Sequence, residues 1–97
     1  MTELIASKAL IAFYPSAIAL MPSEFTSHEF ILALAQSHQA AYVGALAKYA
    51  AAGDPFRTLH SQLSQALYDS PLVHHAGEVE STDIFRNPGR CANWKRV

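Results

Sequence analysis

Along the middle of the chain, apolar residues recur every three or four positions, which predicts an α-helix with one apolar face. The pattern covers residues 26–52 and consists of Phe30, Ile31, Leu34, Ala35, Tyr42, Val43, Leu46, Tyr49 and Ala50. The polar segment Gln36–Gln39 interrupts it, without a Gly or Pro that would force a break. The region is therefore either one long helix or two helices joined by a tight bend. We expect it to end at Gly53, because glycine readily adopts the left-handed conformation that follows a helix.

The start of this region carries a capping signal. With Thr26 as the N-cap, Glu29 falls at the third helical position, from which its carboxylate reaches back to the amide of the cap. Phe25 and Phe30 flank the turn as a hydrophobic staple. Both parts of the motif agree, so the sequence predicts a helix that begins here.

A further helix is predicted from Asp54 to about Tyr68. Asp54 is a favourable N-cap, and Pro55 takes the first helical position, where its missing N–H costs nothing. The helix ends shortly before Pro71. One apolar stripe is expected to face the core, and its members are Phe56, Leu59, Leu63, Ala66 and Leu67.

The opposite face of the helix at 54–68 is polar and contains no acidic residue before Asp69. Solvent faces of stable helices more often carry Glu and Lys pairs, whereas Arg, Gln, Ser and Thr hydrogen-bond to phosphates and base edges. The helix is therefore a candidate DNA reader; the alternative is that Ser and Gln simply solvate a short surface helix. The polar positions are Arg57, Thr58, Ser61, Gln62, Ser64 and Gln65, with His60 at the boundary.

The N-terminal segment predicts a leading helix from Thr2 to about Tyr14, which Pro15 ends or kinks. A faint resemblance to a signal-peptide core exists at residues 9–21. We favour the helix, because polar residues and Pro15 interrupt the stretch and it is shorter than the roughly 20 apolar residues of a membrane-spanning helix. No membrane partner is expected. The core side chains of this helix would be Leu4, Ile5, Ile11 and Phe13.

After Pro71 the pattern changes to short apolar patches separated by turn signals. The turn signals are Ala76-Gly77 and Asn87-Pro88-Gly89, which predicts a small antiparallel hairpin, with a turn of helix at Ser81 to Ile84 as an option. The fold class expected for the whole chain is α+β, with three or four helices followed by a C-terminal β-hairpin. The patches are Leu72-Val73, Val79, Ile84-Phe85 and Cys91 to Trp94.

Composition fits one folded domain. The 97 residues leave no room for a second core, and 51% hydrophobic with 15% charged residues excludes a disordered chain. So little charged surface leaves apolar area to be covered, so we expect a homodimer. The single Cys91 excludes an internal disulfide framework and fits a reducing compartment, for which we expect the cytoplasm.

The formal net charge of -1 hides a basic C-terminal end. Arg86, Arg90, Lys95 and Arg96 lie within the last twelve residues, which contain no acid. Lys and Arg give sequence-independent affinity for nucleic acid by neutralising phosphates. A basic hairpin beside the polar helix at 54–68 would therefore straddle a nucleic-acid backbone.

The order of these elements resembles a winged helix-turn-helix DNA-binding domain over roughly residues 23–97. The shared features are a leading helix, a capped helix, a third helix and a two-stranded wing; no sequence motif is involved. The resemblance implies that the helix at 54–68 enters a major groove. It also implies that the hairpin around Arg86 to Arg90 contacts the adjacent backbone or minor groove.

No residues of a recognisable enzyme or metal site accompany this pattern. His74 and His75 with Cys91 are poor zinc ligands, because adjacent residues of a strand point to opposite faces and no paired spacing is present. A partly buried strand cysteine is a simpler interpretation of Cys91 than a nucleophile. The glycines are scattered singly, without a phosphate-binding loop. We expect no catalytic residue, metal or cofactor.

The sequence thus predicts a non-enzymatic regulator that binds double-stranded DNA. The alternative is a small protein-interaction, accessory or inhibitor module whose basic end meets an acidic protein surface. Of Tyr42, Tyr49 and Tyr68, which would serve such a partner, we expect at least two in the core. The residues expected to contact bases or the DNA backbone are Arg57, Thr58, Ser61, Gln62 and Gln65, and those for phosphates are Arg86, Arg90, Lys95 and Arg96.

Overall fold

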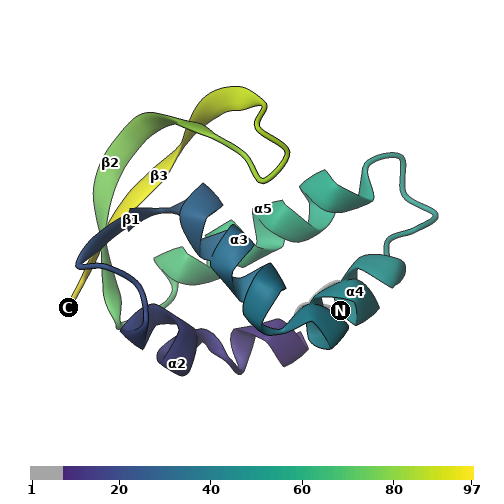
Figure 1. Ribbon diagram of the computed structural model, residues 1–97, viewed down its shortest axis with the longest axis horizontal. Coiled ribbons are helices and arrows are strands. Elements are labelled where there is room, and N and C mark those ends of the chain that lie inside the picture. The colour runs from purple at the N-terminus through teal and green to yellow at the C-terminus, as the bar shows by residue number, and fades with distance from the viewer. Residues whose placement is uncertain (1–7) are drawn as a thin grey trace.

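Helices and one antiparallel sheet form the α+β fold that the sequence predicts, in a computed structural model that describes residues 8–97 (Figure 1). Residues 8–11 are helical. The strands form one sheet of order β1-β3-β2, with both pairings antiparallel. The elements that follow are α2 (Tyr14–Ala19), β1 (Glu24–Thr26), α3 (Ser27–Ser37), α4 (Gln39–Ala47), α5 (Pro55–Tyr68), β2 (Val73–Thr82) and β3 (Pro88–Arg96).

The capping box at the start of α3 is confirmed. The Thr26 hydroxyl accepts the N–H of Glu29 at 3.1 Å, and the Glu29 carboxylate accepts the N–H of Thr26 at 2.8 Å. The rings of Phe25 and Phe30 lie 5.8 Å apart across the turn, as a staple requires. The chain therefore passes directly from β1 into α3, which fixes the angle between the sheet and the helices.

The helical region at 26–52 consists of two helices, and the bend between them lies at His38 (φ -132°, ψ 57°). The Phe13 ring stacks on the His38 imidazole at 3.9 Å and supports this bend. Two predictions here are wrong. The second helix ends at Ala47, and Gly53 does not have the left-handed conformation expected of it. Val43, expected on the apolar face, is 60% exposed, because α4 turns Tyr42 and Ala45 to the core instead.

The leading helix also differs from the prediction. The interruption that Pro15 was expected to cause lies at a turn at residues 12–13, and Pro15 itself lies in the first turn of the next helix, α2. Pro15 has no N–H to donate to the carbonyl of Ile11, which accounts for a break just before it. Phe13 is 36% exposed rather than buried, and Ile11 packs at the margin of the core. Leu4 and Ile5 lie outside the described residues.

The C-terminal hairpin of β2 and β3 is confirmed, with three differences. Ala76-Gly77 is not a turn but a bulge inside β2, where Gly77 has φ 96°. No helical turn forms at Ser81 to Ile84, because Ser81 and Thr82 continue the strand and the turn occupies residues 83–87. The sequence pattern also missed β1, which pairs Phe25 with Trp94 of β3.

The predicted helix α5 carries the centre of the core. Its N-cap Asp54 accepts the N–H of Arg57 at 3.2 Å. Leu59, Leu63 and Leu67 are fully buried, whereas Phe56 of the predicted stripe is 38% exposed. The hydroxyl of Tyr14 on α2 donates to the carbonyl of Leu63, so α2 is tied to the same helix. Tyr42 and Tyr49 are buried and Tyr68 is half exposed, as expected for two of the three tyrosines.

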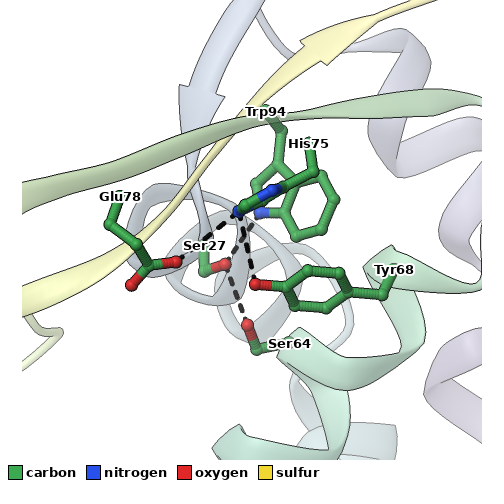
Figure 2. A network of polar contacts seen from close by, with 6 residues as sticks. All are labelled: Ser27, Ser64, Tyr68, His75, Glu78 and Trp94. Carbon is green, nitrogen blue, oxygen red and sulfur yellow. Dashed lines mark hydrogen bonds and ion pairs between the residues drawn. The ribbon is translucent and has the colours of Figure 1, made fainter.

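A buried indole joins the hairpin to the helices (Figure 2). The N–H of Trp94 on β3 donates to the hydroxyl of Ser27 on α3 at 2.8 Å, and that hydroxyl lies 2.9 Å from the hydroxyl of Ser64 on α5. His75, beside the β2 bulge, contacts Tyr68 and the carboxylate of Glu78 and packs against the indole. The sheet, α3 and α5 therefore meet at one point, with Trp94 at its centre.

Replacing Ser27 with alanine tests this junction. Ser27→Ala leaves the indole N–H of Trp94 buried without an acceptor, which we expect to lower the free energy of unfolding by about 1–3 kcal/mol. The matched control is Ser61→Ala on α5, which is exposed and should cost less than about 0.5 kcal/mol. Urea denaturation followed by Trp94 fluorescence measures both. Equal effects of the two variants would contradict the role of Ser27.

Candidate nucleic-acid interface

An open cleft of about 550 Å³ lies between the first turn of α3, the N-terminal half of α5 and the end of the hairpin. In Figure 1 the hairpin arches over α3 and α5, so its loop approaches these helices from above. The Phe85 ring meets the Phe56 ring edge to face, with centroids 4.8 Å apart, and closes one side of the cleft. The polar and charged lining residues are Ser27, His28, Asp54, Arg57, His60, Ser61, Ser64, Asp83, Asn87 and Arg90.

The hairpin loop at residues 83–87 is organised by one carboxylate. Asp83 Oδ1 accepts the N–H of Phe85 at 2.8 Å and that of Asn87 at 2.9 Å, and Oδ2 accepts the Asn87 side-chain amide at 3.3 Å. The hydrogen bonds from Asn87, followed by that from Phe85, lower the pKa of Asp83. Arg86 takes a left-handed conformation with φ 69°. The loop is thereby shaped so that Phe85 faces α5 and Arg86 faces solvent.

On the polar face of α5, some side chains are free and others form hydrogen bonds within the protein. Arg57, Ser61 and Gln65 are exposed and follow one another at intervals of four residues, so they form one row along the helix. The hydroxyl of Thr58 donates to the carbonyl of Asp54 at 2.9 Å. The side-chain oxygen of Gln62 accepts the hydroxyl of Tyr49 at 2.7 Å. Of the five predicted reader residues, the row of three is therefore the part that is exposed to solvent.

The basic residues of the C-terminal end fall into two groups. Arg86 lies on the loop and Arg90 lines the cleft together with Arg57 of α5. Lys95 and Arg96 lie at the other end of β3, five and six residues from Arg90, which corresponds to roughly 15–20 Å. Arg96 donates to the carbonyl of Ala19 at 3.0 Å and so fastens the sheet to the end of α2. The structure does not bring these two residues to the cleft.

Histidines form part of the cleft floor. His60 Nε2 lies 2.7 Å from the hydroxyl of Tyr42, and partial burial lowers the pKa of His60, an effect that Asp83 opposes. Burial therefore favours the neutral form of His60. His28 Nδ1 is buried without a hydrogen-bond partner.

The remaining observations concern possible metal ligands, Cys91 and membrane-spanning helices within residues 8–97. No group of three or more His, Cys, Asp or Glu side chains in this part of the chain has the geometry to hold a metal ion. His75 packs on Trp94 and Tyr68, whereas His74 is exposed beside Lys95 in the register. Cys91 is free and half-buried at the cleft. None of the helices described is both long and apolar enough to cross a membrane.

Several lining residues were not singled out from the sequence. His28, Asp83 and Phe85 reach the cleft only because the hairpin folds back over α5, which no local pattern reports. A weak signal was present at Asp83, since Asp followed by Asn87-Pro88-Gly89 favours a turn stabilised by the Asp side chain. Comparison of the chain with models of protein families, with curated proteins and with solved structures finds no match.

The lowered pKa of His60 predicts that the stability of the protein depends on pH. Because the pKa of His60 is lower in the folded protein than its ordinary value of 6.5, the unfolded chain binds more protons between the two values. The contribution of His60 to the free energy of unfolding is therefore complete above about pH 6.5 and falls as the pH drops through the folded-state pKa. We expect wild-type protein to lose more stability than His60→Gln between about pH 7.5 and about pH 5.5.

Urea denaturation at several pH values, followed by Trp94 fluorescence, measures this difference. His74→Gln is the control, because His74 is exposed and outside the cleft. Its profile should follow that of the wild type. Parallel profiles of the wild type and His60→Gln would show that His60 is not the group responsible.

Proposed function

We propose that this chain binds double-stranded DNA as a non-enzymatic regulator, with α5 and the β2–β3 hairpin as its contacting elements. The observation that carries the proposal is the exposed row Arg57, Ser61 and Gln65 on α5, of which Arg57 and Ser61 line one cleft with Arg90 of the hairpin. These side chain types donate to phosphates and base edges. No acidic residue occurs within α5 itself.

The arrangement of the elements supports this proposal. The hairpin lies beside the helix that precedes it, as the wing of a winged helix-turn-helix domain lies beside its reading helix. The exposed row extends from residue 57 to residue 65, or about 12 Å along the helix. That length corresponds to about three base pairs of B-DNA. Since the Phe56–Phe85 contact holds the loop on the first turn of α5, loop and helix approach the DNA together.

Of the nine residues that the sequence predicts to contact DNA, the proposal keeps five. Lys95 and Arg96 lie roughly 15–20 Å from Arg90 along β3, and Arg96 is held by the carbonyl of Ala19, so we assign them no contact with the phosphates nearest the cleft. Thr58 and Gln62 support α5 through their bonds to Asp54 and Tyr49. The remaining contacts are Arg57, Ser61, Gln65, Arg86 and Arg90.

We also propose that the protein acts as a homodimer in the cytoplasm. Leu20, Val43 and Val97 are 84%, 60% and 75% exposed, and a second subunit is one means of covering such apolar surface. A dimer would present two copies of α5 to two half-sites. The free thiol of Cys91 supports a reducing compartment.

A protein partner is the second candidate, and one observation favours it. Phe56 and Phe85 are 38% and 51% exposed and line the cleft together with Arg57 and Arg90. Exposed aromatic rings flanked by arginine are typical of protein-binding hot spots. An acidic polypeptide would then occupy the surface that we assign to DNA.

Binding to random duplex DNA at low salt tests the proposal directly. We expect a complex in a shift assay, weakened about tenfold by Arg57→Ala and by Arg86→Ala, since each removes one contact worth about 1–3 kcal/mol. Lys95→Ala is the matched control, because it removes the same charge from the other end of β3, and it should change the affinity less than about twofold.

Two results would refute DNA binding by this surface. The first is no detectable complex with the wild-type protein at low salt. The second is a loss of affinity in Lys95→Ala as large as that in Arg57→Ala, which would indicate attraction by net charge alone. Co-purification of a stoichiometric acidic polypeptide would favour the second candidate.

A further inference from the structure

Two arginines line the same cleft, and neither has a partner. Arg57 comes from the first turn of α5 and Arg90 from the start of β3. Both are exposed, and within residues 8–97 their guanidinium groups form neither a hydrogen bond nor an ion pair. Glu80 is the cross-strand neighbour of Arg90, yet it does not pair with it. Two unpaired guanidinium groups at one concave surface are available for an external anion.

The carboxylates of the cleft are occupied by the protein itself. Asp54 accepts the N–H of Arg57 as the N-cap of α5. Both carboxylate oxygens of Asp83 accept hydrogen bonds from Phe85 and Asn87, which stabilises the loop. These carboxylates hold backbone N–H groups instead of the arginine side chains. The positive charge of Arg57 and Arg90 is consequently not cancelled by direct contact.

We propose that this cleft binds one phosphate group between Arg57 and Arg90. Guanidinium groups suit phosphate because they donate two parallel hydrogen bonds to its oxygens. The hydroxyl of Ser61, which the structure shows without a hydrogen bond, lines the cleft as a third donor. Phe56 and Phe85 form an apolar wall, and the lower dielectric beside them strengthens such charge-assisted bonds.

The source of the phosphate rests on the proposed function. If the chain binds DNA, the group is one backbone phosphate, straddled by α5 and the hairpin. A phosphate held at the first turn of α5 would fix the register of the helix, and Gln65 would then extend from it toward the bases. Free inorganic phosphate presents the same tetrahedral oxyanion, so it serves as a probe that does not depend on DNA.

The first experiment uses inorganic phosphate alone. Thermal unfolding of the full chain is followed by Trp94 fluorescence, in phosphate and in chloride at equal ionic strength. At about ten times its Kd, phosphate should raise the Tm by about 5 °C. The increase should disappear in Arg57→Ala and in Arg90→Ala and persist in Lys95→Ala, a control that removes one positive charge from the other end of β3, outside the cleft.

The second experiment counts phosphates on duplex DNA. The slope of log K against log salt changes by about 0.9 for each phosphate neutralised. If Arg57 and Arg90 share one phosphate, the double variant Arg57→Ala/Arg90→Ala reduces the slope by about 0.9, and adding Arg86→Ala reduces it by about a further 0.9. If each contacts its own phosphate, the double variant alone reduces it by about 1.8.

The two experiments separate the site from the function. Stabilisation by phosphate that depends on both arginines, without binding to duplex DNA, upholds the site and refutes DNA binding. Duplex binding with a slope loss of about 1.8 in the double variant overturns the shared phosphate while DNA binding stands. The site is also overturned if phosphate and chloride stabilise the protein equally, or if Lys95→Ala loses the effect as fully as Arg57→Ala.

Discussion

The packing of Trp94 under the hairpin is the interaction on which the rest of the structure depends. Its indole is 1% exposed, pairs in register with Phe25 and donates to Ser27, which in turn contacts Ser64 of α5. A buried indole N–H needs an acceptor, so this bond sets the position of β3 against α3 and α5. The hairpin then runs over α5, and its loop reaches the first turn of that helix.

The sequence predicts the elements of this fold where the signal is local. The capping box at Thr26 and the Asp54-Pro55 start each satisfy backbone donors within a few residues, so each can be recognised without knowledge of the rest. Where the outcome depends on distant partners, prediction fails. Strand β1 exists because β3 pairs with it, and Val43 is exposed because of the way α4 turns after His38.

The candidate site shows the same division. The row Arg57, Ser61 and Gln65 follows from helical spacing once α5 is recognised. That Arg57 and Arg90 line one cleft cannot be predicted from this spacing. The two residues are more than thirty positions apart in the sequence, and they meet because the hairpin folds back over α5. In the sequence, Arg90 and Arg96 belong to the same group of basic residues. In the structure the length of β3 separates them, and Arg96 donates to a carbonyl at the end of α2.

The central claim is that α5 and the hairpin loop form one DNA-binding surface. Amide chemical shifts measured during titration with a short duplex test it most directly, because they locate the contact residue by residue. The account predicts that the largest changes lie at residues 57, 61, 65 and 83–90, while Leu20, Val43 and Lys95 change little. Changes centred on α2 and α4, with α5 and the loop unaffected, would contradict it.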